Sequence, residues 1–243
     1  MVGVAQQSFL VDTKWLSKVV ALAEPSRHEV FFIVGGGDGL VASTLGKAAR
    51  IVTVEPDESV ANYLYSLELF RNMVIHAEPR LVLADIPFDK LVCLQPEHLH
   101  EGFLSSLLRV PFSQAVMVMP DELLKSFRTR DMLGTLLRAA YDVDVVQSVP
   151  KNAFCPALPC ASSLVSVVPT GRRDPVAASL RLLMQEAGTM RGLLTRSCRE
   201  FFDYTLVDAQ EAVRMLPAAL LKKRFWELSE DEFKEVHDWL KLG

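Results

Sequence analysis

Four polar residues that could do chemistry lie close together in the stretch DKLVCLQPEHLHEG, residues 89–102. Glu97, His98, His100 and Glu101 are residue types that bind metal ions or carry protons in acid/base catalysis. A metal site needs at least three converging ligands, and on a helix the two histidines would point about 200° apart. We therefore expect no bound metal. An acid/base role of Glu97 or His98, and the remains of a catalytic motif, both stay open.

The composition is that of an ordinary globular protein, with 243 residues, of which 50% are hydrophobic and 23% charged. The net charge is −4 and neither half of the chain is basic. The chain therefore lacks the overall positive charge that drives non-specific binding to nucleic acid. No apolar run approaches the ~18 residues of a membrane span. The stretch MVGVAQQSFLVDTK lacks the basic and apolar regions of a secretory signal and the Arg-rich character of a transit peptide, so we expect neither. We expect a cytoplasmic protein without a membrane partner.

The four cysteines are scattered and form no C-x-x-C pair, so a structural zinc site is not expected. Cys155 and Cys160 flank the loop CPALPC and could pair in an oxidising cell. Reduced thiols are the expectation for a cytoplasmic chain.

Short β-rich runs alternate with helical patterns through the first half of the chain. The predicted helices are 39–49 and 58–69. The predicted strands are 29–34, 50–54, 72–76, 90–94 and 115–119. Alternation of this kind is typical of an α/β fold with a parallel sheet covered on both faces.

The pattern changes after residue 140. Two strands, 141–149 and 162–169, are expected to form an antiparallel pair at one edge of the sheet. The polar stretch PTGRRDP follows as a linker. Beyond it, amphipathic helices are expected, the last with a capping box formed by Ser229 and Glu232. Their expected ranges are 176–185, 191–202, 208–216, 220–228 and 231–241. We predict a Rossmann-like domain over 1–170 and a helical domain over 171–243.

A glycine-rich turn follows the first predicted strand. Gly35, Gly37 and Gly39 let the backbone turn tightly and approach a ligand at the start of a helix. The next strand ends at Glu55, whose carboxylate can accept hydrogen bonds from both ribose hydroxyls of a nucleoside cofactor. G-x-G-x-G lacks the later glycine of G-x-G-x-x-G, which favours S-adenosylmethionine over a dinucleotide. A glycine turn with an exposed glutamate is the structural alternative.

Several blocks together resemble the KsgA-type ribosomal RNA adenine dimethyltransferases, which are class I S-adenosylmethionine enzymes. Residues 7–12, QSFLVD, resemble the family's Q-N-F-L-x-D, and residues 34–39, VGGGDG, its I-G-P-G-x-G. Residues 52–57, VTVEPD, resemble V-x-A-V-E-x-D, and 154–156 with Ser162 fit part of F-x-P-x-P-x-V-D-S. The resemblance implies a Rossmann-like fold with a small helical C-terminal domain.

The resemblance also implies roles for individual residues. Gln7, Phe9 and Leu10 would belong to a segment that closes over the cofactor, and Glu55 would be the ribose ligand. The family's G-D-A, whose Asp binds the adenine amine of the cofactor, becomes Ala77-Glu78-Pro79 here. Glu78 is the carboxylate that remains.

The family's catalytic N-L-P-Y/F becomes Leu94-Gln95-Pro96-Glu97, of which only the proline is kept. In the family the Asn accepts a hydrogen bond from the adenine amine, and the aromatic residue stacks on the flipped base. Leu94 accepts no hydrogen bond and Glu97 offers no stacking face. Phe154 would remain to stack on one side of the base. The resemblance therefore predicts adenine dimethylation that is weak or lost.

Three functions remain open from the sequence. The first is an rRNA adenine N6-dimethyltransferase homologue, acting on small-subunit rRNA or a pre-ribosomal particle with weak or absent catalysis. The second is a non-catalytic RNA- or protein-binding assembly factor on the same fold. The third is a methyltransferase retargeted to another acceptor through Glu97 or His98. The family resemblance implies a monomer.

Overall fold

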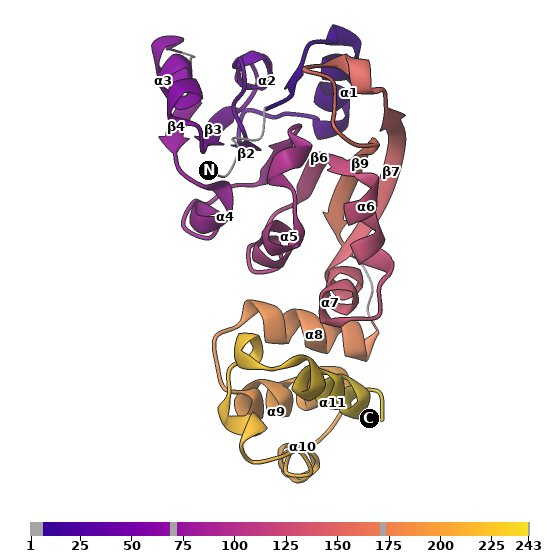
Figure 1. Ribbon diagram of the computed structural model, residues 1–243. Helices are drawn as coiled ribbons and strands as arrows, with labels where there is room; N and C mark the ends of the chain where they lie inside the picture. Colours follow the sequence, from indigo (N-terminus) through magenta and orange to yellow (C-terminus); the bar gives the residue numbers. More distant parts are fainter. Residues whose placement is uncertain (1–6, 69–71, 171–173, 243) are drawn as a thin grey trace. The chain divides into compact units, whose positions relative to one another are not determined.

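We describe a computed structural model of the chain that covers residues 7–68, 72–170 and 174–242. Within these residues the chain forms two compact units (Figure 1). Unit 1 holds residues up to 126 together with 142–169, and unit 2 holds 127–141 and the residues from 170 onward. A segment from the middle of the chain thus packs with the C-terminal helices. The predicted division at residue 170 does not account for this exchange and stays a prediction.

A mixed seven-stranded sheet forms the centre of unit 1 in the described part of the chain. Parallel pairing joins the first five strands of the sheet order, and the sixth, β9, runs antiparallel to β6. In sheet order the strands are β4 (Asn72–His76), β3 (Arg50–Glu55), β2 (Val30–Val34), β5 (Lys90–Cys93), β6 (Gln114–Pro120), β9 (Ser162–Pro169) and β7 (Tyr141–Val149).

The predicted strands are confirmed to within two residues, and β7 and β9 match their predicted bounds. These two strands lie next to each other at the edge of the sheet and point in opposite directions (Figure 1), as expected. The sheet is mixed and not simply parallel because the chain returns through β9 along β6 before it leaves unit 1.

Helices cover both faces of the sheet, with α1–α3 on one side and α4 and α5 on the other (Figure 1). Their bounds are α1 (Thr13–Ala23), α2 (Leu40–Leu45), α3 (Glu58–Ser66), α4 (Pro79–Val82), α5 (Glu101–Leu107) and α6 (Asp121–Leu124). The sequence prediction lacked α1, although Asp12 caps it and apolar residues recur at helical spacing on its buried face. Short 3₁₀ turns complete the unit: η1 (Pro96–His98), η2 (Lys125–Arg128) and η3 (Lys151–Ala153).

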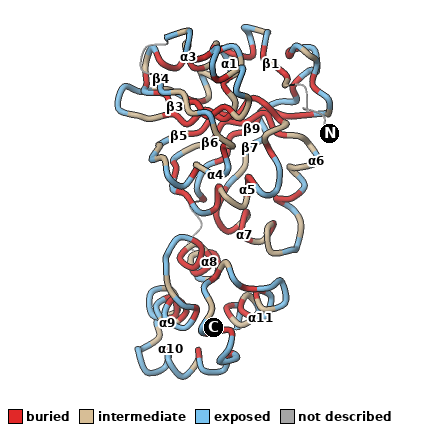
Figure 2. The backbone as a smooth tube through the Cα atoms, turned by 60° about the vertical axis from the view of Figure 1, so that its left-hand side comes forward, coloured by how far each residue is buried: buried red, intermediate tan, exposed pale blue. Residues whose placement is uncertain are grey.

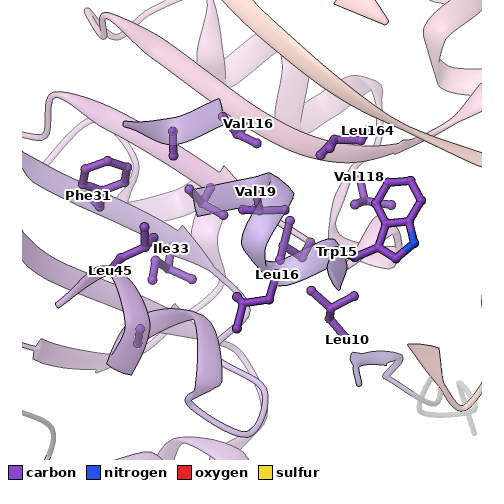
Figure 3. Packing of buried hydrophobic residues seen from close by; sticks show 14 of the residues in the cluster. Leu10, Trp15, Leu16, Val19, Phe31, Ile33, Leu45, Val116, Val118 and Leu164 are labelled. Carbon is purple, nitrogen blue, oxygen red and sulfur yellow. The ribbon is translucent and has the colours of Figure 1, made fainter. Parts of the chain in front are cut away.

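One core cluster of unit 1 lies between α1, α2 and the sheet. Phe31 and Ile33 of β2 meet Leu16 and Val19 of α1 and Leu45 of α2 in one buried cluster (Figure 3). The residues of the central strands are largely buried, as Figure 2 shows in red. Because both faces of the central strands are covered, these strands read as continuous apolar runs and do not alternate.

A second, two-stranded sheet ties the N-terminal segment to the loop between β7 and β9. Its strands are β1 (Phe9–Leu10) and β8 (Phe154–Cys155). Phe9 pairs with Cys155 and Leu10 with Phe154 in antiparallel register. The N-terminal segment is thereby held against unit 1 through a partner almost 150 residues away.

Unit 2 is helical. Its elements are α7 (Met132–Ala140), α8 (Pro175–Gln185), α9 (Met190–Phe201), α10 (Leu206–Val213), η4 (Leu220–Lys222), η5 (Phe225–Glu227) and α11 (Glu230–Leu240). The predicted capping box of α11 is confirmed: Ser229 N–H donates to Glu232 Oε2 at 2.9 Å, and Glu232 N–H donates to Ser229 Oγ at 3.3 Å.

The predicted helix 220–228 is wrong, because two 3₁₀ turns with an extended link replace it. The carbonyl of Lys223 turns outward to accept the Met190 N–H at 2.8 Å, and its ammonium group pairs with Glu232 at 2.6 Å. The backbone at Lys223 is extended, with φ −72° and ψ 160°, which interrupts the helix.

The four cysteines form no disulfide bond in the described part of the chain, and the reduced state of Cys155 and Cys160 stays a prediction. Among the described residues, no helix combines the length and apolar character needed to cross a lipid bilayer.

Candidate functional site

The glycine turn after β2 adopts the conformation that its residues favour. Gly35, Gly37 and Gly39 have φ values of 74°, 55° and 80°, in the left-handed region where a side chain is strained. Gly36 lies between them, and a Cβ there would overlap the side chain of Leu64. The turn therefore depends on glycine for its backbone and for its packing against α3.

Glu55 ends β3 beside this turn and is completely buried. Its carboxylate is already engaged by the chain itself. Oε2 accepts the Gly36 N–H at 2.7 Å, and Oε1 accepts the Asp57 N–H at 3.0 Å and Gln7 Nε2 at 2.9 Å. The alternative of an exposed glutamate is thus wrong. The glycine turn and the carboxylate at the end of β3 meet through the hydrogen bond from Gly36 to Glu55.

The N-terminal segment lies over the turn. Gln7 reaches Glu55, and the ring of Phe9 lies 3.0 Å from the position that a Cβ on Gly37 would occupy. Leu10 is buried in the core cluster. Ser8 N–H donates to Glu97 Oε1 at 2.9 Å, so the segment also contacts the chain beyond β5.

The segment that corresponds to the family's catalytic tetrapeptide follows β5, next to the glycine turn, because β5 pairs with β2. Leu94 is 6% exposed and belongs to the apolar core cluster. Pro96 begins the turn η1 and is buried. Glu97 is half-buried, with one carboxylate oxygen bound to the Ser8 amide and the other without a hydrogen-bond partner among the described residues.

Phe154 and Glu78 were also predicted to contribute. Phe154 is 3% exposed and packs in the same cluster as Leu94, so its ring presents no free face to a base. Glu78 is half-buried at the N-cap position of α4, and its side chain makes no capping hydrogen bond. It follows β4, and the Ala77 N–H beside it donates to the carbonyl of Glu55 at 3.1 Å.

The histidines of residues 89–102 serve separate local interactions. His98 Nε2 lies 3.0 Å from Gln95 Oε1, whereas His100 Nδ1 accepts the Phe103 N–H at the start of α5. Neighbouring Cys93 is fully buried, and this burial raises the pKa of its thiol. No group of three or more metal-binding side chains converges in the described chain.

Gln95 is the residue of the site that the sequence analysis passed over. It is 4% exposed, and its side-chain oxygen lies where a Cβ on Gly35 would be. His98 crowds the same position, with its Cδ2 2.9 Å away. A signal was available: Gln95 replaces the family's apolar Leu with a longer polar side chain at the strand end nearest the glycine turn.

The space left between these groups is small. The cavity lined by the glycine turn, residues 8–10, Leu94 and Gln95 has a volume of about 20 Å³, whereas small-molecule sites measure roughly 300–1,000 Å³. Three buried polar atoms of the site have no hydrogen-bond partner among the described residues: Gln7 Oε1, Gln95 Nε2 and Glu97 Oε2. The site thus combines a glycine cradle, a buried carboxylate and unpaired polar atoms with very little open volume.

The sheet order, the glycine turn after β2 and the acidic end of β3 define a class I S-adenosylmethionine-dependent methyltransferase fold. Solved structures agree. The chain superimposes on a dimethyladenosine transferase from Plasmodium falciparum with a TM-score of 0.59 and 16% identity, covering 96% of each chain. The 23S rRNA methyltransferase ErmE gives a TM-score of 0.57 with 16% identity, covering 96% of this chain and 99% of the other.

Sequence comparison finds relatives that are named for ribosomal RNA methylation. The probable ribosomal RNA small subunit methyltransferase A of Pyrococcus abyssi is 24% identical over 244 residues, covering 97% of this chain and 90% of the relative. The protein of the same name from Methanosarcina mazei is 25% identical over 246 residues, covering 96% and 91%. No protein-family model matches the chain. The chain is a divergent homologue of the KsgA-type rRNA adenine dimethyltransferases.

Proposed function

We propose that this protein acts on small-subunit ribosomal RNA, or on a pre-ribosomal particle, with adenine dimethylation that is weak or lost. One observation carries the second half of the proposal. The two positions that would hold the target adenine are used for other purposes, because Leu94 packs in the core and Glu97 binds the Ser8 amide. The relatives named for small-subunit rRNA methylation support the first half.

The residue types at the site fit S-adenosylmethionine. Gly35, Gly37 and Gly39 offer a turn that a backbone-close ligand can approach, and Glu55 is a buried carboxylate at the strand end beside it. Glu78 would lie toward the adenine ring of the cofactor, and residues 7–10 would cover the cofactor. When bound, the cofactor supplies an electrophilic methyl group on a sulfonium sulfur. Gln7 Oε1 and Glu97 Oε2 are buried acceptors there without a hydrogen-bond partner among the described residues.

The chemistry of an adenine acceptor explains why the replaced residues matter. The N6 lone pair is delocalised into the ring, so an enzyme gains rate by holding the amine and stacking the base. A missing preorganised polar contact costs ~2.7–4 kcal/mol, and a missing stacking platform ~1–3 kcal/mol. If these terms add, the rate falls by about three to five orders of magnitude. Phe154 does not compensate while its ring is buried.

Retargeting to another acceptor would require Glu97 or His98 as a base. His98 Nε2 contacts Gln95, and Glu97 binds the Ser8 amide through Oε1, whereas its Oε2 has no hydrogen-bond partner among the described residues. This arrangement favours a protein that binds its RNA or particle over one that has gained a new reaction. A monomeric, cytoplasmic protein is part of the proposal.

Two assays on the purified chain test the proposal. Co-sedimentation with small ribosomal subunits is expected, and its absence would contradict a ribosomal role. Transfer of labelled methyl groups from S-adenosylmethionine to unmethylated small subunits should be at least about a thousandfold slower than with an active family enzyme. A rate equal to that of the active enzyme would overturn the loss of catalysis.

The double substitution Leu94→Asn with Glu97→Tyr asks whether the tetrapeptide alone accounts for the low rate. A folded double variant that binds the cofactor and gains transfer activity would support that explanation. A folded, cofactor-binding variant without activity would show that other parts of the site have also changed.

A further inference from the structure

The side chain of Gln95 fills the space that the first glycine of the turn leaves open. Gln95 Oε1 and His98 Cδ2 both crowd the position of a Cβ on Gly35. In a class I fold this cradle is where the backbone approaches the ligand. Here the cradle is filled by the chain itself, and only about 20 Å³ remains between the turn and residues 8–10.

The backbone of Gln95 is well anchored. Its carbonyl accepts the His98 N–H at 3.1 Å within η1 and lies 3.4 Å from the Cys93 thiol, which donates to it. These bonds fix the point from which the side chain extends toward Gly35. The position of Gln95 over the turn is therefore set by the short segment that follows β5.

The side chain of Gln95 is held at one end only. Its Oε1 contacts His98 Nε2 at 3.0 Å, and this bond requires the tautomer in which Nε2 carries the proton. Its Nε2 is buried without a hydrogen-bond partner among the described residues. A side chain held in this way blocks the cradle yet can be displaced, because only the His98 contact has to be given up.

We propose that Gln95, supported by His98, is a built-in plug of the cofactor site, which S-adenosylmethionine must displace before it can bind. This inference deepens the proposed function, on which it rests, by assigning a cause of weak cofactor binding that is separate from the loss of the adenine-binding residues. A ligand that binds only the open form has its apparent affinity reduced by the fraction of molecules that are open. Removing the plug removes this reduction.

Titration calorimetry with S-adenosylmethionine tests the plug without any measurement of activity. Gln95→Ala should bind the cofactor at least about tenfold more tightly than the wild-type chain, which corresponds to a plugged form at least about ten times as populated as the open one. His98→Ala leaves the plug in place but unsupported and should give a smaller gain. Gln147→Ala, a matched change of an exposed glutamine on β7, should bind like the wild type.

Each other result contradicts the plug. If Gln95→Ala binds more weakly than the wild type, Gln95 is a contact for the cofactor and not an obstacle. Equal affinity, or no binding by any variant, shows that something else limits binding. Near-ultraviolet circular dichroism and thermal melting establish that each variant is folded. If Gln95→Ala does not fold, the cofactor affinity of His98→Ala tests the plug instead.

Co-sedimentation of Gln95→Ala with small ribosomal subunits separates this inference from the proposed function. The plug faces the glycine turn, so its removal should leave particle binding unchanged. Tighter cofactor binding without particle binding would support the plug and contradict the ribosomal role. Particle binding with unchanged cofactor affinity would support the ribosomal role and contradict the plug.

Discussion

The ends of β2 and β5 lie side by side in one sheet but have diverged to different extents from the family pattern. The turn after β2 keeps all three glycines, each with a positive φ. The segment after β5 keeps only Pro96 of its tetrapeptide. The first region is used by the fold itself, because its three glycines hold a left-handed backbone. Gly36, which stands where the family has Pro, packs against Leu64 and donates its N–H to Glu55. The resemblance implies that the family's Asn and aromatic residue hold the target adenine.

This difference teaches that a retained glycine turn is weak evidence for catalysis. The turn, Glu55 and Gln7 form a set of hydrogen bonds within unit 1 that needs no ligand. Residues whose only role is to hold a substrate can be replaced by residues with a structural role. Under the proposed function Leu94 is such a replacement, and it contributes to the core.

The largest expected effect is on the β5 side. Leu94→Asn should lower the free energy of unfolding by about 3–5 kcal/mol, because it removes a buried apolar side chain and leaves an amide in an apolar cluster. Urea denaturation measures the change. Leu81→Asn is the matched control: Leu81 is 67% exposed, and its replacement should change stability by no more than ~0.5 kcal/mol. A cost below ~1 kcal/mol for Leu94→Asn would mean that the position is still free to hold a substrate.

A smaller effect on the free energy of unfolding is expected where the glycine turn after β2 contacts the segment after β5. Gly35→Ala should cost about 2 kcal/mol, of which ~1 reflects the left-handed backbone and the rest the displacement of Gln95. In a Gln95→Ala background only the backbone part should remain. A double-mutant cycle in urea therefore predicts a coupling of about 1 kcal/mol between residues 35 and 95. Additive costs would place Gln95 away from the turn.

The smallest effect concerns Asp57, the carboxylate two residues beyond Glu55. It caps α3, and its hydrogen bond from the Ser59 hydroxyl, with those from the Val60 and Ser59 amides, lowers its pKa. Because the folded-state pKa lies below the unfolded one, Asp57 stabilises the protein above its ordinary pKa, and this contribution is lost as the pH falls through the folded value.

Asp57→Asn tests this role by denaturation at pH 7 and near pH 3. The wild type should be slightly more stable than the variant at pH 7, and the difference should shrink at the lower pH. A difference that grows on acidification would contradict the assigned role. The result would show that one carboxylate beside the turn is structural, which sharpens the question of what Glu55 does.

Local features of the fold were predictable because they depend on neighbouring residues. Apolar runs separated by turns predicted the strands, and the Ser229–Glu232 pair predicted the start of α11. The helix over 220–228 was wrong because a long-range bond from Met190 to the Lys223 carbonyl outweighs local helix preference. The pattern within a short window does not contain such a bond.

The sequence by itself determined the class of fold, the three left-handed glycines, the carboxylate at the end of β3 and the replaced tetrapeptide. Only the tertiary structure decided how these parts are used. Gln7 meets Glu55 across 48 residues of sequence, and Ser8 meets Glu97 across 89. Such contacts depend on where the folded sheet brings separate strand ends and on how side chains fill the space between them. For that reason Gln95, an unremarked residue in the sequence, lies at the centre of the site in the structure.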